Sequence, residues 1–404
     1  MHTTRKIKED LIYIGGSDRR LSRFENLFPI PRGVSYNSYV LLDEKTVLFD
    51  TADEAVGRLF FENLEYALDG RGLDYLVIHH MEPDHCVLLG EVLRRWPEVT
   101  LVGSAKALSM IQQFFAGAAP ERTLAVSEGD KLSTGRHTLH FMMAPMVHWP
   151  EVMVTYDETD KVLFSADAFG TFGALSGNIF ADEFDFDGAW MDDTRRYYAN
   201  ICGKYGAQVQ VLLKKMAAVD VETVCPLHGP IWRDGMGLLL EKYQMWSACQ
   251  PEEQSVLIVY GTMYGNTENA AAVLAARLAD RGVRNIKLYD VSETDVSELV
   301  SESFRCSHLV LAAPTYNGGL HPKMEAFLND LKALNLQNRT VALLENGTWA
   351  PAAARLMGAI LGAMKNITVL ENTVTFKSAL AEGQAASMDM LADVISAQLA
   401  CAAG

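Results

Sequence analysis

The stretch that decides the fold reads LVIHHMEPDH and occupies residues 76–85. Its apolar, strand-like run ends in an H-x-E-x-D-H cluster, whose potential metal ligands are His80, Glu82, Asp84 and His85. A loop that follows a strand can turn side chains at this spacing into one small volume. Carboxylates and imidazoles so close together are costly to bury without a cation. The cluster therefore predicts a metal site at the end of a strand.

Three further candidate ligands stand alone beside strand-like or turn segments. They are His148 in APMVHWPE, Asp167 in LFSADAFG and His228 in VCPLHGP. A single histidine near a strand end is more often a hydrogen-bonded structural residue than a ligand. Together with the cluster, however, these residues make a set of seven, which is enough for two metals that share a carboxylate.

Composition and charge exclude several classes of protein. The chain has 404 residues, of which 49% are hydrophobic and 21% charged, so it is ordinary globular material of two or three domains. Its 35 basic and 51 acidic residues give a formal net charge of −16. A protein that binds nucleic acid or an anionic membrane normally carries a basic excess or patch, which is not visible here.

The cysteines and the hydropathy indicate a compartment. The six cysteines are scattered, and no two form a C-x-x-C pair, so the chain contains no rubredoxin or zinc-ribbon module. Scattered cysteines fit a reducing compartment. The basic start, MHTTRKIKED, is followed by no apolar signal region, and no run reaches the roughly 18 apolar residues of a membrane span. We expect a soluble, cytoplasmic protein.

The second half of the chain has a regular pattern. The polar stretch 248–254, which contains Pro251, places a domain boundary near residue 252 and predicts domains of 1–252 and 253–404. Apolar runs then alternate with amphipathic stretches, which predicts a parallel sheet of flavodoxin-like, doubly wound topology. The expected strands are 256–260, 286–289, 308–313, 340–345 and 367–370, and the expected helices lie near 267–282, 295–303, 321–334, 350–363 and 384–400.

The first half is less regular and predicts an α+β or layered αββα domain. The expected strands are 11–14, 39–42, 46–50, 75–79, 153–156 and 162–166, and the expected helices lie near 54–68, 86–96, 104–115 and, as one long element, 190–218.

Three loops of the second domain predict a flavin site. The first, residues 261–267, carries a T-x-x-x-x-T pattern between a strand and a helix N-terminus, where hydroxyls and free amides bind a phosphate. The loops at 313–319 and 345–350 stand at the ligand-binding edge of such a sheet, with Tyr316 and Trp349 able to stack on a flat ring. We expect FMN to contact Thr262, Met263, Tyr264, Gly265, Asn266, Thr267, Pro314, Thr315, Tyr316, Asn317, Gly318, Gly319, Asn346, Gly347, Thr348 and Trp349.

The order H-x-E-x-D-H, His, Asp, His resembles the metallo-β-lactamase fold, whose hydrolases usually carry H-x-H-x-D-H. Glu82 in place of the second histidine, together with the flavin domain, resembles the flavodiiron proteins over nearly the whole chain. The resemblance implies one iron bound by His80, Glu82 and His148, a second bound by Asp84, His85 and His228, and Asp167 as the bridge. Whether His85 binds iron stays open, because this position is not always a ligand in the family.

The resemblance also implies the function. A flavodiiron protein passes electrons through FMN to two non-haem irons, which reduce dioxygen to water, nitric oxide to nitrous oxide, or both; no residue predicts the preferred gas. It implies a head-to-tail homodimer or a dimer of dimers, and a separate rubredoxin or reduced deazaflavin as electron donor. Two alternatives remain: a binuclear zinc hydrolase with an accessory flavodoxin domain, and a flavodoxin-like electron carrier with a structural metal domain.

Overall fold

The computed structural model describes residues 1–115 and 122–402. The chain folds into two compact units, the first made of Met1–Tyr198 with Ala207–Gln244 and the second of Ala199–Gly206 with Met245–Gly404. The short segment Ala199–Gly206 thus belongs to the second unit, although the residues that follow it, up to Gln244, belong to the first. The domain boundary near residue 252 stays a prediction.

The first unit contains two sheets. The larger has the order β1-β2-β7-β8-β9-β10-β11 and is parallel from β8 to β11. Its strands are β1 (Arg5–Lys6), β2 (Leu11–Tyr13), β7 (Tyr39–Leu42), β8 (Thr46–Phe49), β9 (Tyr75–Ile78), β10 (Thr100–Ser104) and β11 (Thr123–Val126). The smaller sheet is antiparallel except at its last pair and consists of β12 (Lys131–Ser133), β13 (Thr138–Met143), β14 (Met153–Asp157), β15 (Val162–Phe164) and β16 (Thr223–Cys225).

Aromatic side chains join the inner faces of these two sheets. Phe49 of β8 stacks on Phe164 of β15 with ring centroids 3.8 Å apart, and Tyr39 of β7 reaches the same ring. Two small ribbons, β3 (Gly16–Asp18) with β6 (Val34–Tyr36) and β4 (Arg23–Phe24) with β5 (Phe28–Pro29), complete the strands of this unit.

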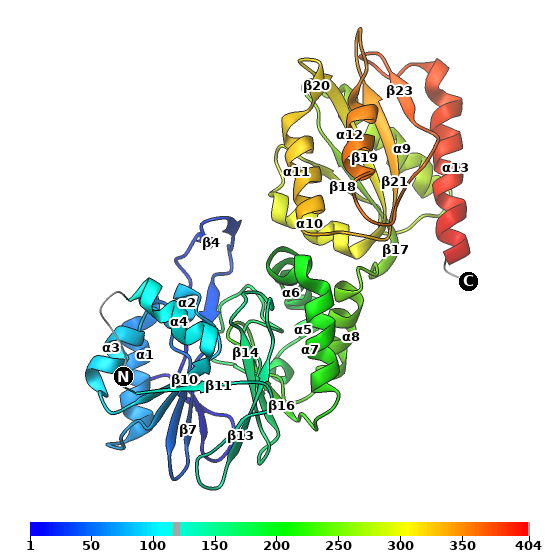
Figure 1. The fold of residues 1–404 in the computed structure, drawn as a ribbon. Helices are drawn as coiled ribbons and strands as arrows, with labels where there is room; N and C mark the ends of the chain where they lie inside the picture. Colours follow the sequence, from blue (N-terminus) through cyan, green and yellow to red (C-terminus); the bar gives the residue numbers. More distant parts are fainter. Residues whose placement is uncertain (116–121, 403–404) are drawn as a thin grey trace. The chain divides into compact units, whose positions relative to one another are not determined.

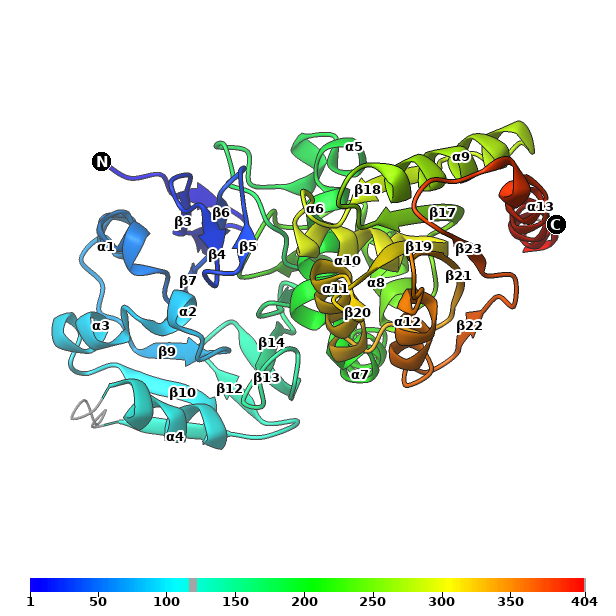
Figure 2. The same ribbon diagram turned by 90° about the horizontal axis from the view of Figure 1, so that it is seen from above.

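Helices flank the sheets, so the predicted αββα arrangement is confirmed (Figures 1 and 2). The helices that cover the larger sheet are α1 (Gly57–Leu68), α3 (Leu89–Arg95) and α4 (Ala105–Phe114). Those beside the smaller sheet are α5 (Phe186–Ala189), α6 (Met191–Tyr197), α7 (Gly206–Met216) and α8 (Met236–Ser247). One-turn α2 (Pro83–Cys86) belongs to the metal-ligand loop, and 3-10 turns lie at Glu54–Val56 and Ala181–Glu183.

The long helix expected at 190–218 is wrong. It is interrupted by a π-helical turn at Tyr198–Cys202 and a 3-10 turn at Gly203–Tyr205. The reason is a close approach of two backbones, because a Cβ on Gly206 would lie 2.4 Å from the carbonyl oxygen of Ser247. The glycine allows this contact and the chain is redirected there.

The second unit is a parallel sheet of order β18-β17-β19-β21-β22, which confirms the flavodoxin-like topology. Its strands are β17 (Glu253–Tyr260), β18 (Lys287–Asp290), β19 (Cys306–Tyr316), β21 (Arg339–Asn346) and β22 (Ile367–Val369), with β20 (Gly319–Leu320) and β23 (Val374–Phe376) at the edge of the ligand loops. Its helices are α9 (Asn266–Asp280), α10 (Val296–Arg305), α11 (Pro322–Ala333), α12 (Ala353–Leu361) and α13 (Ala385–Ala402), with a 3-10 turn at Glu382–Gln384.

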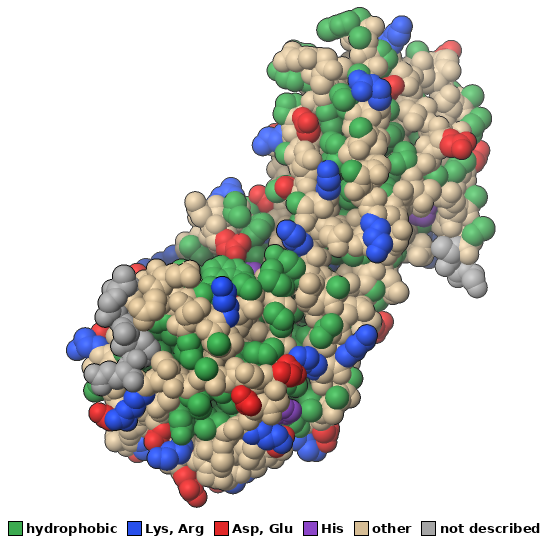
Figure 3. Space-filling view, in the orientation of Figure 1, with side chains coloured by type: hydrophobic (Ala, Val, Ile, Leu, Met, Phe, Trp, Pro, Cys, Tyr) green, Lys and Arg blue, Asp and Glu red, His purple; other side chains and the backbone are tan. Residues whose placement is uncertain are grey.

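Helices cover both faces of this second sheet. Residues of α9 and α13 form one core cluster with the buried side chains of β17, β19 and β21, while α10, α11 and α12 pack against one another on the other side. On the face shown in Figure 3, acidic and basic side chains are interspersed on each unit. Within the described residues, no helix is both long and apolar enough to cross a membrane.

Candidate metal centre and flavin pocket

The loop after β9 positions the first four candidate ligands. The strand ends at Ile78, and Glu82 is the N-cap residue of α2, whose first position is Pro83. Proline fits there because it has no N–H to leave unpaired and its φ angle suits a helix. This one turn of helix buries Asp84 and His85 on the inner side of the loop.

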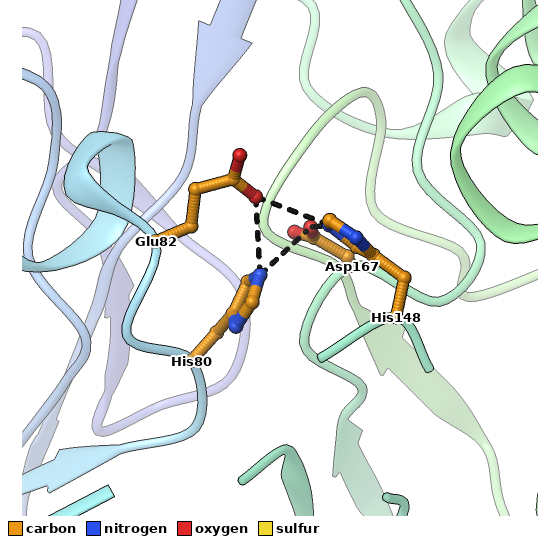
Figure 4. A group of neighbouring side chains, drawn as sticks. All are labelled: His80, Glu82, His148 and Asp167. Carbon is orange, nitrogen blue, oxygen red and sulfur yellow. Dashed lines mark hydrogen bonds and ion pairs between the residues drawn. The ribbon is translucent and has the colours of Figure 1, made fainter. Parts of the chain in front are cut away.

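His80, Glu82, His148 and Asp167 form the first group, and their donor atoms lie within 4.8 Å of one another. The Glu82 Oε2 atom lies 3.1 Å from Nε2 of both His80 and His148. Asp167 Oδ2 lies 3.1 Å from His148 Nε2 and 3.5 Å from His80 Nε2. Figure 4 shows the four side chains pointing toward one another, with His80 and Glu82 on the loop after β9 and His148 and Asp167 on two other segments.

Asp84, His85 and His228 form the second group. The Asp84 Oδ2 atom lies 3.4 Å from His85 Nε2 and 3.3 Å from His228 Nε2. Asp167 contacts this group through its other oxygen, since Oδ1 lies 3.1 Å from His85 Nε2 and 3.7 Å from His228 Nε2. One carboxylate thus faces both groups, one oxygen to each. His85 points inward like its neighbours.

The chemistry of these groups fits two cations. Both Asp84 oxygens, Asp167 Oδ1, and the Nε2 atoms of His85 and His228 are buried without a hydrogen-bond partner. Burial alone would lower the pKa of His85, yet the carboxylates of Asp84 and Asp167 raise it to about 9. Buried polar groups are normally paired, and a cation pairs several at once. These atoms without partners thus belong to the second group and to Asp167, the carboxylate that faces both groups.

Outer contacts fix the orientation of the candidate ligands. Glu151 is buried, and its Oε1 accepts from the Met81 backbone N–H at 2.9 Å and contacts His80 Nδ1 at 2.8 Å. His228 Nδ1 lies 2.7 Å from the Ser35 carbonyl oxygen. Such partners hold an imidazole with its other nitrogen toward a metal. Sequence reasoning missed Glu151, although it stands three residues after His148.

Aromatic rings line the centre. Phe24, Tyr36 and Tyr197 place their rings 5.3–5.7 Å from that of His228. Trp149 meets the ring of His80 edge-on at 5.2 Å. Aromatic rings thus pack against candidate ligands of both groups, and electrostatic interactions are stronger in such a buried site than in water.

A cavity of about 430 Å³ lies at the carboxyl ends of the strands in the second unit. The three predicted loops line it, and two residues that sequence reasoning missed, Ala350 and Ser378, do so as well. Gly265 and Gly319 are the predicted residues outside its lining. Gly265 instead has a positive φ of 88° at the N-cap of α9, which is a turn position that suits glycine.

The cavity fits a phosphate-bearing flat ring. It opens on the N-terminus of α9, where backbone amides favour an anion, and Thr262 Oγ1 accepts from the Gly265 N–H at 3.0 Å. No lysine or arginine is among the described residues that line it. The two predicted stacking residues, Tyr316 and Trp349, both line the cavity and are 43% and 88% exposed, so each ring has a surface that can stack on a ligand.

Comparisons with known proteins agree with both halves. The family model described as ODP family beta lactamase matches residues 34–229, and that of flavodoxin matches residues 258–389. The chain therefore falls in the class of proteins that join a β-lactamase-like domain to a flavodoxin domain.

Individual relatives narrow this class. An anaerobic nitric oxide reductase flavorubredoxin of Escherichia coli is 31% identical over 86% of this chain and 73% of its own. An uncharacterised protein of Methanocaldococcus jannaschii is 32% identical over 80% of both chains. The structure of rubredoxin oxygen:oxidoreductase from Desulfovibrio gigas superposes with a TM-score of 0.92 at 28% identity, covering 98% of this chain and 99% of its own. The flavodiiron protein of Giardia intestinalis gives 0.90 at 26% identity over 98% of each chain. The chain belongs to the flavodiiron protein family.

Proposed function

We propose that this protein is an FMN-dependent oxidoreductase that reduces dioxygen, nitric oxide or both at a diiron centre. The observation that carries the proposal is the presence, in one chain of this family, of two adjoining groups of buried metal ligands and a flavin-sized cavity. Either feature alone would suit other functions. Their combination suits a transfer of electrons that ends in reduction of a small molecule.

Seven residues would hold the metals. His80, Glu82 and His148 would hold one iron, Asp84, His85 and His228 would hold the other, and Asp167 would be shared between them. The inward direction of His85 Nε2 supports its role as a ligand, which the sequence left open. Three carboxylates in the set favour iron over zinc, because hard oxygen ligands shift the preference away from an imidazole-rich zinc site.

When bound, the irons supply open coordination positions for a diatomic gas and FMN supplies stored electrons. The chain's own residues do the rest. Glu151 orients His80 through its Nδ1 atom, and the Ser35 carbonyl orients His228. The aromatic rings around His228 limit the access of water. The Thr262–Thr267 loop and the N-terminus of α9 bind the cofactor phosphate.

The proposal also includes the electron donor, the oligomeric assembly and the cellular compartment. A rubredoxin-type protein, or alternatively a reduced deazaflavin, delivers electrons to the flavin, in keeping with the name of the Desulfovibrio gigas relative. A homodimer, head to tail, is the proposed assembly. We propose that the protein is cytoplasmic, because its six cysteines are scattered along the sequence and form no dense disulfide-type pattern.

The binuclear zinc hydrolase is the weaker interpretation, because the flavin-sized cavity would then have no role in the reaction. Anaerobic purification followed by metal and flavin analysis separates the two. We expect two irons and one FMN per chain, and consumption of dioxygen or nitric oxide with reduced rubredoxin as donor. Two zinc ions without consumption of either gas would contradict the proposal.

A further inference from the structure

A fourth segment of chain borders the flavin cavity. Strand β23 pairs in parallel with the carboxyl end of β21, matching Leu344 with Val374 and Asn346 with Phe376. Strand β22 pairs only with the other end of β21. Because β22 and β23 pair with opposite ends of β21, the chain after β23 lies at the ligand-binding edge of the sheet, where Ser378 lines the cavity.

Asn346 holds Ser378 in place. Its Oδ1 atom accepts from the Ser378 N–H at 2.9 Å, and its Nδ2 donates to the Ser378 carbonyl oxygen at 2.9 Å. Nδ2 also lies 3.4 Å from Thr267 Oγ1, in the phosphate loop. Asn346 is buried, and its side-chain amide links three of the segments that line the cavity.

Ser378 is held in an unusual conformation. Its φ angle is +64°, in the left-handed region that residues other than glycine seldom adopt. Such a conformation costs free energy and persists only where neighbouring contacts impose it. The paired bonds from Asn346 are contacts of this kind, and strained residues concentrate at ligand sites.

The consequence is a pair of hydroxyls on the cavity wall. Ser378 Oγ lies 2.9 Å from Thr348 Oγ1, and both residues line the cavity. Two hydroxyls carry two hydrogens, and the bond between them uses one. The other is left to donate to an acceptor in the cavity.

We propose that Ser378, paired with Thr348, is a flavin-binding residue that donates a hydrogen bond to the cofactor, and that Asn346 is its positioning residue. The inference rests on the proposed function, because it takes FMN as the occupant of the cavity. It adds a fourth binding segment to the three loops that carry the phosphate and ring-stacking residues.

The test is FMN binding to the flavin-free protein, followed by flavin fluorescence. Ser378→Gly removes the hydroxyl but tolerates the left-handed backbone, and Ser378→Ala removes it while keeping the strain. One lost hydrogen bond weakens binding about fivefold, so both variants should bind FMN at least that much more weakly. Ser292→Gly, an exposed turn position outside the cavity, is the control and should bind as the wild type does.

Two further readouts test the role of Asn346. Asn346→Ala should speed hydrogen exchange of the Ser378 amide in the flavin-free protein. The double variant, Asn346→Ala with Ser378→Gly, should bind FMN no more weakly than the single variant with the larger loss, because both substitutions remove the same contact. Fully additive losses would overturn the positioning role. If the wild type binds FMN and Ser378→Gly binds it equally well, the inference fails alone; if the wild type does not bind FMN, the proposed function fails with it.

Discussion

Glu82 is the residue on which the choice of metal depends. Its Oε2 lies 3.1 Å from the imidazoles of both His80 and His148, so it occupies the centre of the first ligand group. Glu82→His should lower the iron content and raise the zinc content, because it replaces a hard oxygen ligand by imidazole. Elemental analysis after growth with both metals measures this ratio. Glu98→His, on an exposed side chain, is the control, and an unchanged iron content in Glu82→His would contradict the argument.

Glu151 should control how tightly the first group binds its metal. Glu151→Gln keeps the shape of the side chain but removes the charge that holds His80 Nδ1. Loss of such an outer partner typically weakens metal binding about 10–100-fold. Metal loss to a competing chelator measures the effect, with the partly exposed Glu158→Gln as control. If Glu151→Gln and Glu158→Gln retain the metal equally well, Glu151 does not control metal binding.

The residues of the site that could be predicted from the sequence are those whose side chains are typical metal ligands. The seven candidate ligands could be selected from the sequence because several carboxylates and imidazoles crowd into one loop and the rest stand at strand ends. The structure brings all seven together, and their role as ligands stays a prediction. Glu151 and Ser378 could not be selected, because a single glutamate or serine acquires its role only from the partner that folding places beside it.

At the scale of elements, the loop after β21 contains Trp349, whose substitution tests the flavin site. Trp349 is largely exposed at the cavity rim, so its ring has little packing to lose. Trp349→Ala should weaken FMN binding, since stacking of aromatic rings contributes roughly 1 kcal/mol beyond buried area. Flavin content of the purified variant and its FMN dissociation constant measure this. Full flavin retention would assign Trp349 another role.

A second cluster of charges joins four segments at the edge of the two sheets of the first unit. His137 Nδ1 lies 2.7 Å from Asp157 Oδ2, and its Nε2 lies 3.0 Å from Asp10 Oδ2. Arg136 pairs with both Asp10 and Asp160, so the cluster is an ion-pair network. Burial alone would lower the pKa of His137, but the carboxylates of Asp157 and Asp10 raise it to about 9.

This network predicts a pH dependence of stability. A raised pKa means that protonated His137 stabilises the fold fully below about pH 6.5, and that this stabilisation is lost as the pH rises through about 9. The wild type should lose on the order of 1–3 kcal/mol of unfolding free energy over this range. His137→Gln should flatten the profile, while His140→Gln, more exposed, should not. Denaturant unfolding of metal-loaded protein checks it, and parallel profiles would contradict it.

Element prediction succeeded where periodicity was strong. The five strand–helix repeats of the second unit are recognisable because buried parallel strands are uniformly apolar and the helices between them amphipathic. Several strands of the less regular first unit were missed, among them the five-residue β10, the six-residue β13 and the three-residue β12, which has no buried residue. The break between α6 and α7 escaped as well, since it depends on the approach of Gly206 to Ser247, far away in the sequence.

At the scale of the whole molecule, we expect electrons stored on FMN to leave through the metal centre. Both sites lie in one chain, and the family joins the same two domains. Removing the metals while leaving the flavin should therefore abolish rapid gas reduction without changing the flavodoxin domain.

The most direct measurement mixes anaerobic protein carrying reduced FMN with dioxygen or nitric oxide and follows flavin reoxidation in a stopped-flow spectrometer. We expect rapid reoxidation by at least one gas in iron-loaded protein. Reoxidation should be at least tenfold slower in protein stripped of metal or reloaded with zinc, a difference of about 1.4 kcal/mol in the barrier. Equal rates with and without iron would show that electrons do not leave FMN through the metal centre.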